Sequence, residues 1–590
     1  MCGIAGIVMR DGSEPDTAIL DAFESALQHR GPDGSGRYVD GAVCLLQTRL
    51  AIIDLQTGDQ PLYARRPNGG LVTLVANGEI YNYRELRQQL GSAPFETNSD
   101  CEPPLYLYLR EGISFARYLR GMYAIAIHDP ETDRLILSRD PFGIKPLYYI
   151  ESPKFFAFAS EAQALIKAGL VRRNVDPLVA QELLQLQFTT GSKTPFLDIR
   201  RVLPGETIVI RAGRIIERHK IDALPGLGVS NISEAKAITG LDAILSDSIN
   251  FHQRADVPYG MFLSGGIDSS VLISVMRRLN EKPVQAFTIG FGSDAGVPDE
   301  RAHARAVAKA VKAEHTEVLF TENDFWTLLP RVAAVLDDPV ADYAVLPTYK
   351  LAAVARTAGL KVVLSGEGGD EMLAGYGRYR RATRPWFFGG RNIRRRGTLD
   401  GFNILSENSS KWRKGFETVE SALLTGYSGI QRGQALDCTD WLPNGLLTKV
   451  DRCLMAHGIE GRVPFLDVPF ASFTFSLPDH LKVRRQTGKW LMRKWLENEL
   501  PDSQPFARKR GFTVPVGEWL ARKGDQLGPL VASQPGIEAL CQKETTVALY
   551  RAKGKREGLA QWVLLFYALW HQYHVLGKPA EGSAFDLLAA

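Results

Sequence analysis

The chain has 590 residues, a formal net charge of +4 and 45% hydrophobic residues. This length suffices for roughly two to four domains of a soluble globular protein. The small net charge predicts no nucleic-acid partner. Six cysteines without zinc-site or disulfide-framework spacing predict a reducing, cytoplasmic location. Arg10 and Asp11 interrupt the first apolar run, and no later run reaches about 18 residues. We therefore expect no signal peptide, no membrane-spanning helix and no membrane partner.

The first part of the chain is predicted to form short strands joined by turns. The clearest strands are residues 43–46, 71–76, 122–128 and 134–137. The turn-type sequence at residues 129–133 predicts that the last two of these strands form a hairpin. Helices are expected at residues 17–27 and 83–90. Because few helices separate the strands, this part should have a mostly antiparallel core.

The pattern changes after residues 223–233, a Gly- and Ser-containing segment that divides the chain into predicted domains 2–218 and 235–580. Beyond it strands and helices alternate, which predicts a parallel sheet with helices on both faces. The expected strands are 259–263, 284–289, 317–319 and 361–364, and the expected helices are 233–254, 269–278, 300–312 and 348–358. From about Tyr379 the chain should be helical, with a buried helix around residues 562–570. The basic run 391–396 indicates a solvated insertion loop.

The second residue is a cysteine. If Met1 is removed, Cys2 carries both a thiol and a free α-amine. The reference pKa of that amine, about 8, leaves part of it neutral near physiological pH. A neutral amine beside a thiol is a general base for a nucleophile. Considered alone, Cys2 is explained equally well as an ordinary cysteine on a buried strand.

Four short motifs supply partners for such a nucleophile: HRGPDG at 29–34, TRLAI at 48–52, NGEIYN at 77–82 and SD at 99–100. Asn77 can donate a hydrogen bond from its side chain and Gly78 from its backbone, so both can stabilise an oxyanion. Arg49 can bind a carboxylate through two hydrogen bonds. Glu79 and Asp100 can hold an ammonium group. A ligand with a carboxylate, an ammonium group and a cleavable amide is glutamine. Taken singly, a hairpin turn and a surface ion pair would explain these motifs.

The N-terminal CGI is followed in order by HRGPDG, RLAIID, NGEIYN, SDCE, GMYAIAI and RDPFGIKPLYY. Residues 1–210 thereby resemble the class II glutamine amidotransferases, whose nucleophile is the N-terminal residue. The resemblance implies an α+β fold, an αββα sandwich of the Ntn type, in which Cys2 attacks the glutamine amide and ammonia is released. The residues implied for glutamine binding and the oxyanion hole are Arg49, Asn77, Gly78, Glu79 and Asp100.

Two glycine-rich turns follow predicted strands of the second domain: SGGIDSS at 264–270 and LSGEGGDE at 364–371. Gly265 and Gly266 let the backbone approach phosphate oxygens, and the helix N-terminus that follows favours anions. Neither turn ends in the Gly-Lys-Ser/Thr of a Walker A loop. Asp268 and Asp370 offer carboxylates for Mg²⁺ on a polyphosphate. For an isolated SGG, a simple N-terminal capping turn would be the favoured explanation.

Together the two turns resemble the pyrophosphate-loop (PP-loop) ATP pyrophosphatases, in particular their asparagine synthetase branch. The resemblance spans residues 235–580 and continues through FTIG at 287–290, EMLAGY at 371–376, EGRVPFLD at 460–467 and TGK at 487–489. It implies an α/β domain with a parallel sheet and a helical C-terminal part. Asp268 and Asp370 are implied to bind Mg²⁺-pyrophosphate, Glu367 to lie beside the reacting carboxylate, and Lys489 to stabilise the adenylation transition state. The implied ATP contacts are Phe262, Leu263, Ser264, Gly265, Gly266, Asp268, Ser269, Ile289, Ser365 and Gly366.

The two resemblances imply that aspartate is amidated to asparagine with ammonia from glutamine. ATP would activate the carboxylate as an acyl-adenylate and leave as AMP and pyrophosphate. An enclosed path would keep the ammonia neutral. Arg30, Met122 and residues 139–149 are implied to line this path, although ordinary core strands explain them equally well. The resemblance also implies a homodimer.

Two alternatives remain open from the sequence. Relatives that amidate peptides or form β-lactams share the ATP motifs. The intact Cys2 set argues against the cyclising type, and Glu367 with Lys489 favours the asparagine branch. Gly369 and the long insert 380–441 leave room for a larger carboxylate acceptor. A non-enzymatic module that retains the scaffold is the second alternative, and the presence of Cys2, Asp268 and Lys489 argues against it.

Overall fold

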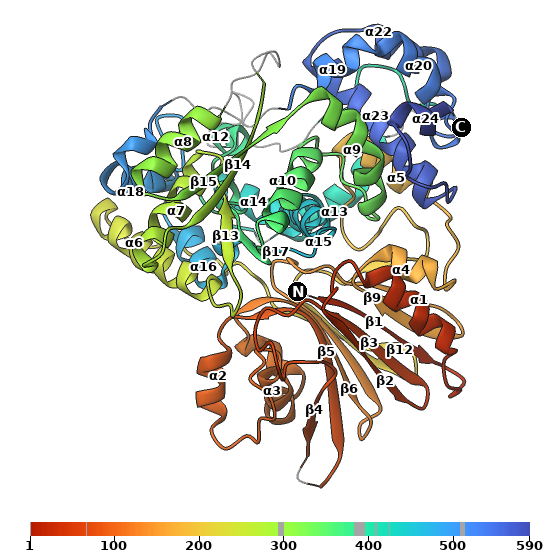
Figure 1. Ribbon diagram of the computed structural model, residues 1–590, viewed down its shortest axis with the longest axis vertical. Helices are drawn as coiled ribbons and strands as arrows, with labels where there is room; N and C mark the ends of the chain where they lie inside the picture. The colour runs from red at the N-terminus through yellow and green to blue at the C-terminus, as the bar shows by residue number, and fades with distance from the viewer. Residues whose placement is uncertain are drawn as a thin grey trace.

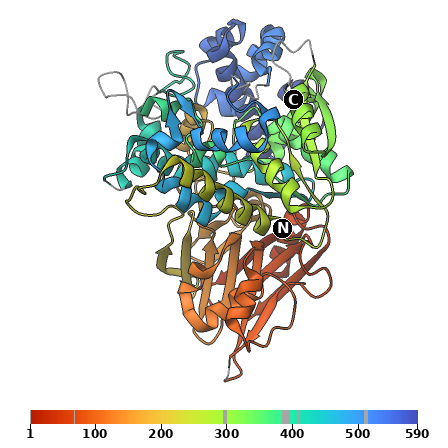
Figure 2. The same ribbon diagram turned by 90° about the vertical axis from the view of Figure 1, so that its left-hand side faces the viewer.

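The computed structural model describes residues 2–66, 68–292, 300–382, 396–407, 410–423, 425–507 and 514–589. Figures 1 and 2 show two stacked parts: the sheets of the N-terminal part lie below, and the helix-rich remainder lies above. The start of the chain lies at the junction between them in both views. None of the helices in the described ranges combines the length and the apolar character needed to cross a bilayer.

The N-terminal part contains two six-stranded sheets that lie face to face. Neighbouring strands are antiparallel in both sheets, which confirms the predicted antiparallel core and hairpin. In order, the first sheet consists of β10 (Arg200–Arg201), β8 (Tyr148–Glu151), β9 (Phe155–Ala159), β1 (Cys2–Met9), β3 (Val43–Arg49) and β2 (Gly34–Asp40). The second consists of β12 (Arg214–Lys220), β11 (Glu206–Arg211), β7 (Arg134–Arg139), β6 (Gly121–Asp129), β5 (Leu71–Ile80) and β4 (Leu62–Arg65).

Helices cover the outer face of each sheet, because the central strands are apolar on both sides. Along β6, Ala124 and Ala126 face the other sheet, whereas Ile125 and Ile127 pack with α3 (Pro103–Glu111). The helices α1 (Thr17–Leu27) and α4 (Ala162–Lys167) cover the first sheet in the same way. The helix α2 (Tyr83–Leu90) lies beside α3. The layers are therefore helix, sheet, sheet and helix.

The second part is built on a five-stranded sheet whose neighbouring strands are all parallel, as predicted. Its order is β15 (Glu314–Phe320), β14 (Gln285–Phe291), β13 (Tyr259–Phe262), β16 (Val362–Leu364) and β17 (Glu460–Arg462). Along β14, Ala286 and Phe287 face opposite sides. One face packs against α6 (Glu234–His252), α7 (Ile267–Leu279) and α8 (Arg301–Ala310). The other packs against α9 (Glu322–Val335), α10 (Val345–Thr357) and α23 (Lys555–His574).

The expectation that the chain is helical from Tyr379 onward is wrong at two places. The strand β17 joins the parallel sheet, and β18 (Val483–Arg484) pairs with β19 (Thr487–Gly488). Strands this short carry no periodicity of their own, since pairing with a distant strand creates them. The buried helix predicted around residues 562–570 is confirmed inside α23. Of the basic run 391–396, only Arg396 lies within the described residues.

The remaining helical segments fill the space around these sheets. They are η1 (Gly112–Tyr118), α5 (Pro177–Leu186), α11 (Gly369–Met372), α12 (Gly377–Ala382), η4 (Ser410–Arg413), α13 (Lys414–Ala422), α14 (Gly429–Leu436), the π-helical η5 (Asp437–Leu447), α15 (Thr448–Met455), η6 (Pro464–Leu466), α16 (Val468–Ser476), α17 (Asp479–Lys482), α18 (Trp490–Glu499), η7 (Pro501–Ser503), α19 (Val516–Arg522), α20 (Gly524–Ala532), α21 (Pro535–Glu538), α22 (Lys543–Arg551) and α24 (Ala584–Ala589).

Candidate functional site

Cys2 is the first residue of β1 and lies opposite Arg49 of β3. Its backbone N–H donates to Asn77 Oδ1 at 3.2 Å, which joins the nucleophile candidate to β5 of the other sheet. Because Oδ1 accepts this bond, the other polar atom of the Asn77 amide is the nitrogen Nδ2. Within the described residues, that buried Nδ2 has no hydrogen-bond partner. A buried, unused donor on a side chain that contacts Cys2 fits a group that stabilises an oxyanion.

The neighbouring Gly78 has a backbone φ of 153° within β5. A Cβ atom at this position would overlap with the carbonyl oxygen of Met122 on β6, so only glycine lets the two strands approach. The Cys2 thiol is buried, and burial raises its pKa above the ordinary value. The thiol is therefore protonated at neutral pH and needs a base to become a nucleophile.

Two buried carboxyl groups lie close to this nucleophile. Asp100 accepts a hydrogen bond from the backbone N–H of Ile80 at 2.7 Å, and burial raises its pKa to about 6. Burial, together with the charges of Glu460 and Asp100, raises the pKa of Glu79. Two acidic groups that repel each other in a buried site would both be stabilised by a ligand's ammonium group.

Arg49 already has a carboxylate partner in this structure. Its Nη1 donates to Asp59 at 2.6 Å, and its Nη2 donates to the backbone carbonyl of Asp54. The Asp59 side chain is 81% exposed, whereas that of Arg49 is 10% exposed. The exposed carboxylate of Asp59 thus pairs with the Arg49 guanidinium, which the sequence analysis expects to bind a ligand carboxylate. Asp59 was missed because no motif marks it.

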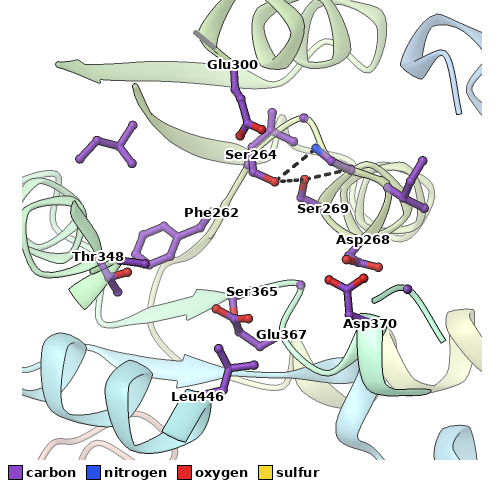
Figure 3. A pocket seen from close by; sticks show the side chains of 18 of the residues that line it. Phe262, Ser264, Asp268, Ser269, Glu300, Thr348, Ser365, Glu367, Asp370 and Leu446 are labelled. Atoms are coloured by element: carbon purple, nitrogen blue, oxygen red, sulfur yellow. Dashed lines mark hydrogen bonds between the residues drawn. The ribbon is translucent and has the colours of Figure 1, made fainter. Parts of the chain in front are cut away.

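The second site is a cavity of about 600 Å³ bounded by the two glycine-rich turns. Figure 3 shows Asp268 and Asp370 pointing toward each other at one end, with Phe262 and Thr348 at the other. The Ser264 Oγ accepts from the backbone N–H of Gly266 at 3.2 Å, which stabilises the first turn at the start of α7. The structure brings every predicted nucleotide residue to the cavity wall, namely Phe262, Leu263, Ser264, Gly265, Gly266, Asp268, Ser269, Ile289, Ser365 and Gly366.

Lys489 joins the two carboxylates at the polar end of the cavity. Its ammonium group pairs with Asp370 at 2.7 Å and also with Asp268. Burial alone would lower the pKa of Lys489, but the two carboxylates raise it above the ordinary value. The amine is therefore charged. A lysine that bridges two carboxylates shows that their mutual position accommodates a cation.

The same pair of carboxylates fits Mg²⁺ only in part. In the described ranges, no group of three or more His, Cys, Asp or Glu side chains is arranged to hold a metal. Magnesium ions usually take one or two protein carboxylates and complete their shell with water and substrate phosphates. Asp268 and Asp370 match that pattern, so they could hold Mg²⁺ together with a polyphosphate but not as an all-protein cage.

Three charged residues of the site were missed by the sequence analysis. Lys449 and Asp342 line the cavity between the two glycine-rich turns and pair with each other at 2.9 Å. Arg462, in the EGRVPFLD motif that was noted without a role, pairs with Glu79 of the first site at 3.3 Å. Its motif was the only available signal, because Lys449 and Asp342 lie in segments without recognisable pattern.

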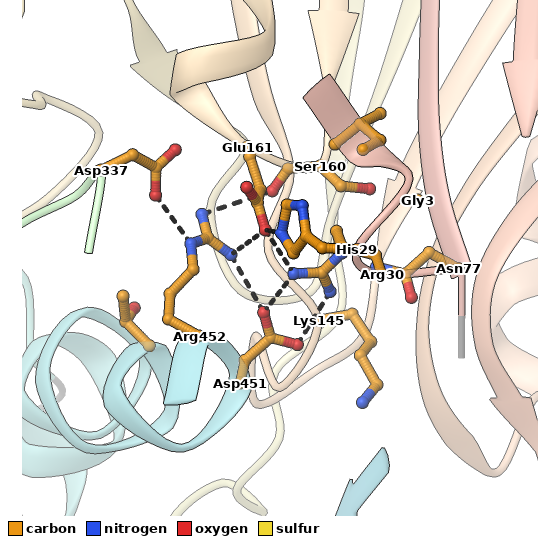
Figure 4. A network of polar contacts seen from close by, with 12 residues as sticks. Gly3, His29, Arg30, Asn77, Lys145, Ser160, Glu161, Asp337, Asp451 and Arg452 are labelled. Carbon is orange, nitrogen blue, oxygen red and sulfur yellow. Dashed lines mark hydrogen bonds and ion pairs between the residues drawn. The ribbon is translucent and has the colours of Figure 1, made fainter. Parts of the chain in front are cut away.

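A buried ion network joins the two parts of the chain, and it comprises His29, Arg30, Glu161, Asp337, Asp451 and Arg452 (Figure 4). Arg30 Nε donates to the backbone carbonyl of Cys2 at 3.2 Å. Its Nη1 and Nη2 donate to Asp451 on α15 at 2.7 and 3.0 Å. Arg30 therefore links the backbone of Cys2 to the second part.

The structure separates the residues predicted to line an ammonia path. Met122, Phe142 and Ile144 belong to a hydrophobic core that also contains residues of the second part. Arg139 instead donates to backbone carbonyls of its own sheet region, at Lys145, Val202 and Gly143. Arg139 therefore fits the alternative that these residues are ordinary parts of core strands. Met122 instead lies where the two parts of the chain meet. The path itself stays a prediction.

Comparison with known families decides what these sites belong to. Residues 240–572 match the family model of asparagine synthase, and residues 1–220 match that of the glutamine amidotransferase domain. The chain belongs to the asparagine synthase family. It is 30% identical to glutamine-hydrolysing asparagine synthetase 1 of Bacillus subtilis, over 98% of this chain and 97% of the relative. It is 29% identical to glutamine-hydrolysing asparagine synthetase B of Escherichia coli, over 92% of this chain and 86% of the relative. Both resemblances predicted from the motifs are confirmed.

The buried ion network should contribute measurably to stability in this family member. Asp451→Asn leaves the buried Arg30 and Arg452 without one of their carboxylate partners, which should lower the free energy of unfolding by about 3 kcal/mol. Glu317→Gln is the matched control, because its partner Arg305 is 64% exposed, and it should cost less than about 1 kcal/mol. Urea unfolding followed by tryptophan fluorescence measures both. Equal, small changes in the two variants would contradict the prediction.

The raised pKa of Asp100 predicts an acidic limb for glutamine hydrolysis. The carboxyl is ionised above a pH of about 6 and neutral below it. A neutral carboxyl binds an ammonium group weakly, so kcat/KM for glutamine should fall roughly tenfold per pH unit below that value. Rates of glutamate release across the acidic range measure this. The control substrate is 4-carbamoylbutanoate, which lacks the α-amine and should show only the fall that protonation of the Cys2 α-amine causes with both substrates. An identical limb for both substrates would refute the role of Asp100.

Proposed function

We propose that this protein is a glutamine-hydrolysing asparagine synthetase, a carbon–nitrogen ligase that makes asparagine from aspartate, glutamine and ATP. The observation that carries the proposal is the presence of two chemically distinct sites in one chain. Cys2 lies beside the unused amide donor of Asn77, and Asp268, Asp370 and Lys489 lie at the polar end of a cavity between two glycine-rich turns. The first suits amide cleavage and the second suits a polyphosphate.

At the first site, removal of Met1 would free the α-amine of Cys2 to take the thiol proton. The thiolate would attack the glutamine amide carbon, and the oxyanion would receive hydrogen bonds from Asn77 Nδ2 and the Gly78 N–H. Collapse of this intermediate would release ammonia, and water would then cleave the thioester to give glutamate. Asp100 and Glu79 would hold the glutamine ammonium group, and Arg49 its carboxylate after Asp59 gives way.

At the second site, the aspartate β-carboxylate would attack the α-phosphorus of ATP, and pyrophosphate would leave. Lys489 supplies positive charge where negative charge grows in that step. Asp268 and Asp370 would hold Mg²⁺, which would neutralise the charge on pyrophosphate. Ammonia would then attack the acyl carbon and displace AMP. Burial raises the pKa of Glu367 on the cavity wall, so this carboxylate can accept the proton that ammonia loses.

The domain division belongs to the same proposal. We assign residues 2–218 to the glutaminase domain and residues 235–580 to the PP-loop synthetase domain. A cytoplasmic homodimer with no nucleic-acid partner remains our expectation. The ammonia would cross the junction where Met122 lies, since that core excludes water.

The direct test supplies glutamine, MgATP and aspartate and measures asparagine and pyrophosphate. The two products should appear in equal amounts. Lys489→Ala removes a preorganised charge, so it should raise the activation barrier for pyrophosphate release by about 3 kcal/mol or more. Glutamate release should stay near the parent rate in that variant. If another carboxylate or a peptide gives pyrophosphate while aspartate does not, the acceptor is wrong.

Separating the two half-reactions tests the nucleophile. Cys2→Ala should lose glutamine hydrolysis by several orders of magnitude and still make asparagine from concentrated ammonium at mildly alkaline pH. Asp268→Ala is the matched control, since its defect lies in the other site and ammonium should not rescue it. A tag that blocks Met1 removal should act like Cys2→Ala because it leaves the α-amine in an amide bond. Glutamine hydrolysis at the parent rate by Cys2→Ala would rule out this nucleophile.

A further inference from the structure

An ion pair forms part of the nucleotide cavity wall and is not used by the steps above. Lys449 on α15 donates to Asp342 Oδ2 at 2.9 Å, and both residues line the cavity. The Lys449 side chain is 6% exposed and that of Asp342 is 21% exposed. Asp342 is held in place by a second bond, because its Oδ1 accepts from the backbone N–H of Ala344 at 3.0 Å.

Stability alone explains this pair poorly. Removing two charges from water costs about as much free energy as their attraction returns, so a buried pair is weak evidence for a stabilising role. The apolar side chains of Val450, Leu446 and Leu454 line the same cavity, so apolar residues are compatible with this wall. A charged pair that faces a cavity is suited to bind a ligand with the opposite charges.

Glu367 lines the same cavity as this ion pair. Burial would lower the pKa of Lys449, but Asp342 and then Glu367 raise it, and Lys449 opposes the rise that burial causes in the pKa of Glu367. The ion pair therefore lies within electrostatic reach of the residue proposed to act beside the reacting carboxylate. Figure 3 shows Glu367 between Leu446 and the carboxylates of Asp268 and Asp370. Leu446 lies one helical turn before Lys449. A ligand bound at the ion pair would therefore extend toward Glu367, beside which its carboxylate would be activated.

We propose that Lys449 and Asp342 form the recognition site for the α-amino-acid end of the acceptor. Lys449 binds the α-carboxylate and Asp342 binds the α-ammonium group, so that the pair and the zwitterion lie side by side with opposite charges matched. This inference rests on the proposed function, and it names the part of the acceptor that the protein reads. Glu367 then faces the side-chain carboxylate that is adenylated.

The proposal limits the class of acceptor. A carboxylate acceptor without a free α-carboxylate would lose the contact with Lys449, and one without an α-ammonium group would lose the contact with Asp342. Side-chain carboxylates within a peptide chain lack both free groups. The site therefore favours a free amino acid with a short acidic side chain over a peptide.

The first experiment uses the unmodified full-length protein and three acceptors with MgATP and ammonium. Aspartate has both α-groups, β-alanine lacks only the α-carboxylate, and succinate lacks only the α-ammonium group. The kcat/KM for pyrophosphate release should be roughly 100-fold higher with aspartate than with either analogue, as expected when one hydrogen bond to a charged group is lost. Equal values for aspartate and β-alanine would overturn the role of Lys449 without any variant.

The second experiment assigns the two groups to the two residues. Lys449→Met should lower kcat/KM for aspartate by roughly 100-fold while leaving β-alanine within about threefold, because β-alanine has no group for Lys449 to bind. Asp342→Asn should likewise lower kcat/KM for aspartate by roughly 100-fold while leaving succinate within about threefold, because succinate has no ammonium group for Asp342 to bind. Lys350→Met is the matched control, since Lys350 lies outside the cavity wall and pairs with Asp324. Glutamine hydrolysis reports whether each variant is folded.

The outcomes separate this inference from the proposed function. If no acceptor gives pyrophosphate, the asparagine synthetase assignment fails. If aspartate reacts but Lys449→Met loses the same factor with aspartate and β-alanine, Lys449 only shapes the cavity and the recognition proposal is wrong. Should Lys449→Met lose glutamine hydrolysis as well, Lys449→Arg tests the same point. It keeps the charge and should retain the preference for aspartate over β-alanine.

Discussion

Arg30 is completely buried, and its guanidinium is shared between the two parts of the chain. It donates to the backbone carbonyl of Cys2 on one side and to both carboxylate oxygens of Asp451 on the other. A buried guanidinium is tolerated only when its donors are satisfied, so the position of β1 and the position of α15 fix each other. The arrangement of both candidate sites depends on this contact.

The helix α15 connects that contact to the cavity between the two glycine-rich turns. Asp451 and Arg452 face the buried ion network, whereas Lys449 and Val450, one turn or less away, line the cavity wall. A second link runs from Glu79 to Arg462 of β17, the edge strand of the parallel sheet. A reaction that passes ammonia from one site to another needs the sites at a fixed separation and needs water excluded between them. Two short elements, α15 and β17, supply that rigidity.

Charge is distributed differently in the two sites. The first contains acidic groups whose pKa values are raised by burial, so it is poised to receive a cation such as an ammonium group. In the second, the ammonium group of Lys489 neutralises the carboxylates of Asp268 and Asp370. Asp59 on Arg49 has a comparable part in the first site. In each case a protein group pairs with the charged side chain that the proposed substrate would bind. This pairing avoids the free-energy cost of an unpaired buried charge.

The sequence determined the local features. Strands with few helices between them predicted antiparallel sheets, and alternating strands and helices predicted the parallel sheet that follows. The motifs carried a family resemblance that implied ten nucleotide contacts, and the structure places all ten on one cavity wall, because they lie in turns and strand ends that neighbours along the chain define. The tertiary structure alone decided which charges meet. Arg30 and Asp451 are 421 residues apart, and Asp342 and Lys449 are 107 residues apart. The strand β17 exists only because β16 pairs with it. Such contacts arise from the packing of distant elements, which leaves no periodic signal in the segments that make them.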